Sequence, residues 1–161
     1  MPSTTIAINA VAEGLVSSRF LQPGDVVLQS DQEHMGGRSG WLHYARLGFF
    51  SLDYFPIPMH GSTEHSIIAS IAAALRPRTR VVCLSHVTTT TGIRLPIKAI
   101  ADMLRPKNIL LVVDGAQSAG AIHMPAPPPP PPRLPRRRAG TSTTVPPTLR
   151  PTLTNCNNLA Q

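Results

Sequence analysis

The stretch Ile109-Leu110-Leu111-Val112-Val113-Asp114-Gly115-Ala116-Gln117 decides the fold. Its leading residues are all apolar, and they run without a break into an acidic residue and a glycine-containing turn. An unbroken apolar run is typical of a parallel strand that is covered on both faces, whereas a strand with one wet face alternates apolar and polar residues. The segment therefore predicts an interior strand of an α/β protein, with polar side chains at its carboxyl end.

Three earlier segments are also predicted to be strands. Residues 26–28 and 81–84 are short apolar runs, and residues 51–58 form a further candidate, whose prolines place it at a sheet edge or at its own end. Helices are predicted between the strands, where apolar residues recur three and four positions apart. They cover residues 4–18, 41–47, 62–75 and 96–104, with Pro96 as the first helical residue of the last one. This alternation predicts an α/β fold: a mainly parallel, doubly wound sheet with helices on both faces.

The composition changes abruptly after residue 124. Residues 1–124 contain 10 basic and 8 acidic side chains, whereas residues 125–161 contain 5 basic side chains, no acidic ones and 11 of the 18 prolines. A segment of this kind cannot bury enough apolar area to offset the entropy of ordering. We therefore expect one domain over residues 1–124 and a disordered Pro/Arg-rich tail over residues 125–161. The basic character belongs mainly to the tail, so it gives no reason to expect nucleic-acid binding by the domain.

Other broad classes are disfavoured by what the sequence lacks. It has no apolar run of about 18 residues and no secretory signal, which predicts a soluble, cytoplasmic protein without membrane contact. The Ser/Thr-rich opening up to Arg19 is compatible with an organelle transit peptide, but the helical pattern explains the same residues better. Cys83 and Cys156, far apart in the chain, build neither a disulfide framework nor a metal site.

Three predicted strands end in polar residues, at Asp31–His34, Ser85–Thr91 and Asp114–Gln117. In open parallel sheets ligands bind beyond the carboxyl ends of the strands, so these segments predict one shared site. An apolar strand ending in Asp also occurs in nucleotide hydrolases and response regulators. The phosphate loop of the former and the acidic cluster and Lys of the latter are missing, and no GxGxxG occurs.

Six segments, taken in order, carry a family resemblance: Thr4–Asn9, Gly24–Val27, Asp31–His34, Ser85–Val87 with Gly92, Leu95–Ile97 and Val113–Gln117. Together they resemble the class V aminotransferase family, pyridoxal-phosphate enzymes of fold type I that include cysteine desulfurases and isopenicillin N epimerase-like proteins. The similarity covers residues 3 to about 123, and the residues at Asp31–His34 and Ser85–Gly92 are most similar to the epimerase-like branch. It implies a partial fold type I large domain, pyridoxal 5′-phosphate as cofactor, an amino-acid substrate and, in the parent family, a homodimer.

The resemblance also assigns roles around the cofactor ring. Asp114 would pair with the pyridine nitrogen and keep it protonated, so that the ring accepts electrons from the substrate's α-carbon. Gln117 would donate to the phenolic oxygen, and His34 would stack on the ring face. Taken singly, Asp114 is equally consistent with a strand-end turn or a helix cap, and His34 with an ordinary loop histidine.

The remaining assignments concern the phosphate and the loop after residue 85. Thr4 and Thr5 would hold the cofactor phosphate at a helix start, although they also fit an N-cap pair. Thr89 stands where desulfurase relatives often have an Asn near the phenolic oxygen. His86 is interpreted as structural, because it shapes the loop that follows its strand.

Family members continue into a Ser-x-His-Lys type segment that supplies the Schiff-base lysine, and no such segment occurs here. The chain has two lysines, Lys98 and Lys107. Lys98 belongs to a predicted helix. Lys107 precedes the strand that ends at Asp114, so the length of that strand, about 17 Å at the usual rise, separates the two. We therefore expect no catalytic residue, weak or no binding of pyridoxal phosphate, and an inactive fragment of the parent enzyme.

One alternative of a different class remains open. Pro128–Arg133 fits the PxxPx-basic pattern that SH3-type domains bind, and Arg136–Arg138 adds a contact for an acidic surface. The chain would then be a non-catalytic interaction protein that acts through its tail.

Overall fold

The computed structural model describes residues 3–59 and 61–122. The expected tail over residues 125–161, its polyproline motif at Pro128–Arg133 and the boundary after residue 124 lie outside these residues. Within them, no helix is both long enough and apolar enough to span a bilayer.

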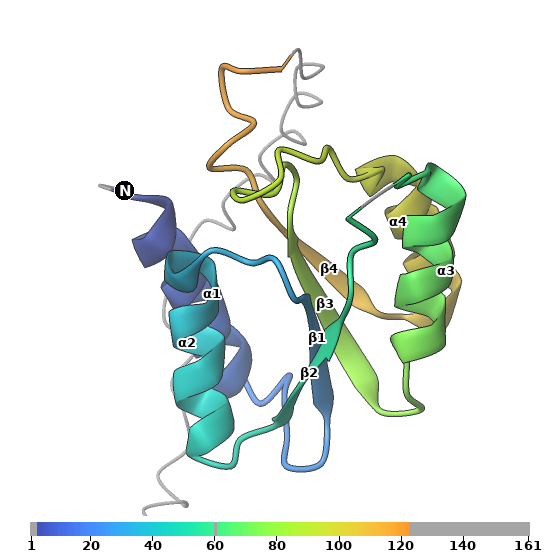
Figure 1. The fold of residues 1–161 in the computed structure, drawn as a ribbon. Helices are drawn as coiled ribbons and strands as arrows, with labels where there is room; N and C mark the ends of the chain where they lie inside the picture. The colour runs from blue at the N-terminus through green and yellow to red at the C-terminus, as the bar shows by residue number, and fades with distance from the viewer. Residues whose placement is uncertain (1–2, 60, 123–161) are drawn as a thin grey trace, which may run out of the picture. The chain divides into compact units, whose positions relative to one another are not determined.

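Four strands form one parallel sheet in the order β2-β1-β3-β4 (Figure 1). They are β1 (Val26–Ser30), β2 (Ser51–Phe55), β3 (Thr79–Ser85) and β4 (Leu110–Asp114). From β1 the chain steps outward to β2 and then crosses back over β1 to reach β3. The reversal leaves a crevice between the carboxyl ends of β1 and β3, which is where open α/β sheets bind ligands.

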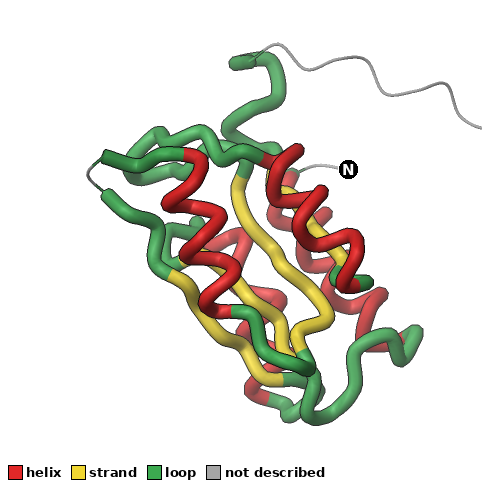
Figure 2. The backbone as a smooth tube through the Cα atoms, turned by 90° about the vertical axis from the view of Figure 1, so that its right-hand side faces the viewer, coloured by secondary structure: helices red, strands yellow, loops and turns green. Residues whose placement is uncertain are grey.

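Helices cover both faces of this sheet, as predicted. On one face lie α1 (Thr4–Ser17) and α2 (Met35–Arg46), which run side by side (Figure 1). On the other lie α3 (Glu64–Ala74) and α4 (Ile97–Leu104), which Figure 2 shows in front of the strands, and the short 3₁₀ helix η1 (Arg105–Lys107) follows α4. The α/β doubly wound prediction is confirmed.

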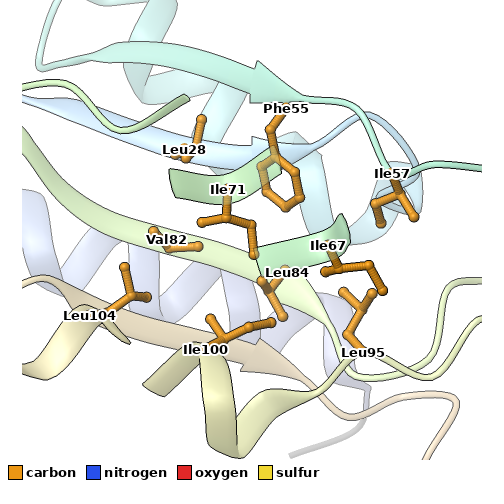
Figure 3. Close-up of a cluster of buried hydrophobic side chains, with 10 residues drawn as sticks. All are labelled: Leu28, Phe55, Ile57, Ile67, Ile71, Val82, Leu84, Leu95, Ile100 and Leu104. Atoms are coloured by element: carbon orange, nitrogen blue, oxygen red, sulfur yellow. The ribbon is translucent and has the colours of Figure 1, made fainter. Parts of the chain in front are cut away.

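Alternating strand residues divide the core into two clusters. Leu28, Val82 and Leu84 pack with Ile71 of α3 and Ile100 of α4, and all five side chains are buried (Figure 3). Their strand neighbours point the other way, because successive side chains of a strand face opposite sides of the sheet. This second cluster, against α1 and α2, contains Ile8, Ala12, Leu21, Val27, Trp41, Phe50, Val81 and Cys83.

Several boundaries differ from the prediction. The helix predicted over 41–47 begins earlier, at Met35. Its first turn contains Gly36 and Gly37, which are poor helix formers, so the sequence pattern did not indicate the true start. Pro96 caps α4 from outside instead of being its first residue. The strand predicted over 51–58 ends at Phe55, since the proline that follows has no N–H for the sheet.

Candidate functional site

The structure brings all six residues that the sequence assigned to a site into one cavity of about 210 Å³ at the carboxyl ends of the strands. They come from the start of α1, the β1–α2 junction, the loop after β3 and the end of β4. The cavity is lined by Thr4, Thr5, His34, Gly37, Ser85, Val87, Thr89, Asp114, Ala116 and Gln117. The predicted convergence of the three strand-end segments is therefore observed.

Asp114, the last residue of β4, presents a carboxylate to this cavity and is 8% exposed. Its Oδ1 accepts the backbone N–H of Ala116 at 2.9 Å. Within the described chain, its Oδ2 has no hydrogen-bond partner and the carboxylate forms no ion pair. A Cβ on Gly37 would lie 3.1 Å from Oδ2, so the absence of a side chain there keeps space beside this oxygen. The arrangement leaves one oxygen able to accept a hydrogen bond from a cationic donor.

The first turn of α1 forms a second wall. Ser3 is the N-cap and its hydroxyl accepts the N–H of Ile6 at 3.3 Å, so neither Thr4 nor Thr5 is the cap. The N–H groups of the first helical residues, Thr4 and Thr5, have no acceptor within the helix. Together with two hydroxyl groups and the positive end of the helix dipole, they form a set of donors suited to an anion such as a phosphate.

His34 is held in place by the start of α2. It is the N-cap of that helix, and its Nδ1 accepts the N–H of Gly36 at 3.1 Å. This hydrogen bond orients the imidazole ring. A side chain at Gly36 would collide with the hydroxyl of Thr5, so glycine lets the first turns of α1 and α2 approach closely. His34 and Thr5 thus line the same cavity.

Thr89 is placed by hydrogen bonds of its neighbours. Thr88 is buried, and its Oγ1 accepts the N–H of Ile93 at 2.9 Å and lies 2.7 Å from Oγ1 of Thr91. The Thr91 hydroxyl donates to Oε1 of Gln32 at 2.6 Å, which ties this loop to the one after β1. The exposed Thr89 therefore lies on a loop that hydrogen bonds of Thr88 and Thr91 hold in place on either side of it.

Beneath the cavity lies a buried carboxyl group that the sequence analysis did not select. Glu33 is 7% exposed and accepts three hydrogen bonds: from the Ser30 hydroxyl, from the Ser85 N–H at 3.1 Å and from the Ser85 hydroxyl at 2.6 Å. Burial raises the pKa of Glu33, hydrogen bonds from the two serines oppose this, and the nearby charge of Asp114 adds to the rise. The available signal was an acidic residue one position before the predicted stacking histidine.

His86 contributes its backbone to the framework and does not line the cavity. Its N–H donates to the carbonyl of Asp114 at 2.9 Å, and its carbonyl accepts the N–H of Leu95 at 2.8 Å. Burial and, secondarily, the charge of Arg94 lower the pKa of its imidazole. Its position agrees with the structural role expected for it.

Neither lysine reaches the cavity. Lys98 is exposed on α4 and pairs with Asp102 at 2.8 Å, while Lys107 belongs to η1, which leads into the amino end of β4. The cavity lies at the opposite, carboxyl end of that strand. Over the residues that the structure covers, no three His, Cys, Asp or Glu side chains are grouped to hold a metal ion.

Comparison with protein families gives a match between residues 1–126 and the family described as aminotransferase class-V. Isopenicillin N epimerase of Streptomyces clavuligerus is 37% identical over 122 residues, which are 76% of this chain and 30% of that protein. A probable cysteine desulfurase of Vibrio cholerae serotype O1 is 34% identical over 119 residues, which are 74% of this chain and 28% of that protein. The chain thus spans less than a third of these relatives.

Solved structures show the same fold. The cysteine desulfurase CsdA from Escherichia coli aligns over 76% of this chain and 29% of its own, with a TM-score of 0.63 and 28% identity. A C-DES mutant with glycine covalently linked to the PLP cofactor aligns over 63% of this chain and 27% of its own, with a TM-score of 0.58 and 32% identity. The resemblance read from the six sequence segments is confirmed.

Proposed function

Since the chain belongs to the class V aminotransferase family, whose cofactor is pyridoxal phosphate, we propose that its cavity binds this cofactor without a covalent bond. The observation that carries the proposal is the convergence of a phosphate-type donor set, an unpaired carboxylate oxygen and a fixed imidazole on one cavity. These are the three kinds of group that a phosphorylated pyridine needs.

Each wall has one task in this proposal. The N–H and hydroxyl groups of Thr4 and Thr5 hold the phosphate. Oδ2 of Asp114 accepts a hydrogen bond from the protonated ring nitrogen, and the His34 ring lies on one face of the cofactor. Gln117 and Thr89 contact the phenolic oxygen. When bound, pyridoxal phosphate supplies a ring that withdraws electrons from an attached amino acid, and Asp114 keeps the ring nitrogen protonated for that purpose.

Binding is weak in this proposal, and the chain by itself does not turn over an amino acid. The cavity is smaller than the about 300–1,000 Å³ of typical ligand pockets, so a bound cofactor stays partly exposed. Neither Lys98 nor Lys107 lines it, so neither lysine amine is placed to form a Schiff base or to move the α-proton. We expect a Kd no tighter than the micromolar range, about 8 kcal/mol.

The test uses the full chain and measures binding of pyridoxal phosphate by equilibrium dialysis. Asp114→Asn removes the charge and keeps the shape, so we expect Kd to rise about tenfold, the effect of losing one charge-assisted hydrogen bond. Asp102→Asn makes the same chemical change on exposed α4, away from the cavity, and leaves Kd unchanged.

Two results would contradict the proposal. One is the absence of saturable binding by the wild-type chain at millimolar cofactor. The other is equal affinity of the Asp114→Asn and Asp102→Asn variants, which would mean that any binding occurs elsewhere on the surface.

A further inference from the structure

We propose that Glu33 is a positioning residue of this site, which braces two of its walls from below and adds a second negative charge behind Asp114. The proposal rests on the proposed function for the identity of the ligand. It concerns a side chain that does not line the cavity itself.

The bracing follows from three hydrogen bonds made by one carboxylate. Glu33 binds the hydroxyl of Ser30, the last residue of β1, and both the N–H and the hydroxyl of Ser85, the last residue of β3. It therefore joins the carboxyl ends of the two strands on either side of the crevice. Ser85 lines the cavity, and the residue after Glu33 is His34, which also lines it. One buried group thus fixes the spacing between two walls.

The charge effect follows from the register of the sheet. Ser85 on β3 and Asp114 on β4 are direct partners, and both line the cavity. Glu33 binds Ser85 at the end of β3, and Asp114 ends the neighbouring strand β4, so the two carboxylates lie at the ends of adjacent strands. Glu33 is buried, and it forms no ion pair with any residue of the described part. When Glu33 is ionised, above its raised pKa, its charge acts in a medium of low dielectric constant and favours the protonated form of a pyridine nitrogen at Asp114.

Asp31 offers a matched control on the same loop. It stands two positions earlier and is exposed, and its Oδ1 accepts the N–H of Ile57 at 3.1 Å. Like Glu33, it ties the end of β1 to another segment, but it reaches the chain after β2 and does not line the cavity. Asp31→Asn therefore removes a negative charge and weakens a hydrogen bond on the same loop, but it leaves the hydrogen bonds between Glu33 and Ser85 intact.

The experiment compares the full-length wild type, Glu33→Gln and Asp31→Asn with 4-deoxypyridoxine 5′-phosphate as the probe. This analogue has no aldehyde and cannot react with Lys98 or Lys107. Its Kd is measured by equilibrium dialysis, and the pKa of its bound ring by an absorbance titration. For Glu33→Gln we expect Kd to rise about three- to tenfold and the proton affinity of the bound ring to fall about threefold. Asp31→Asn changes neither quantity.

A further variant separates the brace from the charge. Ser30→Ala removes a hydroxyl that binds Glu33, does not touch the cavity lining and leaves the carboxylate in place, so Kd rises while the pKa of the bound ring stays within error of wild type. This variant also decides the bracing role if Glu33→Gln fails to fold.

The outcomes separate this inference from the function on which it rests. If Glu33→Gln matches Asp31→Asn in both Kd and ring pKa, Glu33 has no positioning role while cofactor binding stands. If Ser30→Ala leaves Kd unchanged, the brace is wrong. If the wild type does not bind the analogue, the proposed function fails and this inference falls with it.

Discussion

The two faces of the sheet are packed with different chemistry, although the same strands build both. The face under α3 and α4 is hydrocarbon throughout its buried cluster (Figure 3). The face under α1 and α2 also buries Gln29, Cys83 and Trp41, and it leads directly to Ser85 and Asp114 at the strand ends. Burial raises the pKa of the Cys83 thiol to about 12, so the thiol stays neutral beside these groups.

The difference shows how a small α/β unit can divide its tasks between two surfaces. Gln29 Oε1 is buried without a hydrogen-bond partner among the described atoms, which costs stability on the α1/α2 face. The buried cluster under α3 and α4 is made of apolar side chains. We infer that the α3/α4 face supplies stability and that the α1/α2 face gives up part of it to keep polar groups beside the site.

The largest expected effect is on the apolar face. Ile71→Ala should lower the free energy of unfolding by about 2–5 kcal/mol, because Ile71 is completely buried between α3 and the sheet. If that unfolds the chain, Ile71→Val, at about 0.5–1.5 kcal/mol, gives the same information. Urea unfolding measures the change. Cofactor affinity of the folded fraction should not move, and a large change in Kd would break the division between the faces.

A smaller and more local effect is expected from a glycine of the polar face. Gly37→Ala places a methyl group 3.1 Å from Oδ2 of Asp114, so the carboxylate must shift and cofactor affinity should fall about three- to tenfold. Gly14→Ala is the control, because no atom lies within 4 Å of its new methyl group. In the last turn of α1 it should stabilise the chain by up to about 0.5–1 kcal/mol and leave Kd unaltered. Equal Kd values for both variants would argue against Asp114 as the ring contact.

The pH dependence of stability should distinguish the faces further. The pKa of Glu33 is raised in the folded state, so the folded protein binds more protons than the unfolded chain above the ordinary glutamate pKa of about 4.3. Its contribution is fully present below that value and is lost as the pH rises through the raised pKa. The slope from this one group is at most about 1.4 kcal/mol per pH unit. Urea unfolding from pH 4 upward should show the loss in wild type and its absence in Glu33→Gln. Identical slopes would contradict a buried acid whose pKa is raised in the folded state.

The smallest effect is expected at the two lysines, because neither lines the cavity. After incubation with pyridoxal phosphate and reduction by borohydride, mass spectrometry should find only a trace of label, spread over Lys98 and Lys107. Replacing both by Arg should leave the noncovalent Kd unchanged. Stoichiometric label at one lysine, together with turnover of an amino acid, would show that an anchor exists.

The fold was largely predictable because its strongest signals are local. The apolar runs at 81–84 and 109–113 correctly identified two parallel strands, since a strand with one wet face would carry polar residues at alternate positions. Of the two, β3 is interior, whereas β4 is an edge strand of the described sheet and its Leu110 is exposed, so the interior position predicted for it was wrong. The early start of α2 was not predictable from helix propensity, because Gly36 and Gly37 are there for close approach to Thr5 and Asp114. Tertiary packing overrides propensity at these positions.

The site was predictable where a chemical group ends a strand or begins a helix. Asp114, His34 and Thr5 were identified in this way, with the family resemblance supplying their roles. Glu33 and Ser85 were missed as a pair, because their hydrogen bonds join segments that are far apart in the sequence and depend on the strand order. No spacing rule within one segment contains that information.

The cavity is closed by the first and the last segments of the described chain, Thr4 at one end and Gln117 at the other. We expect contacts between residues so far apart in the sequence to form late in folding, because the entropy of closing a long loop is lost before the contacts add stability. During synthesis the site is therefore incomplete until the turn after Asp114 has left the ribosome. In the proposed complex the cofactor bridges both segments, so local opening of either one would release it, and we expect its presence to protect the amide hydrogens at both ends from exchange.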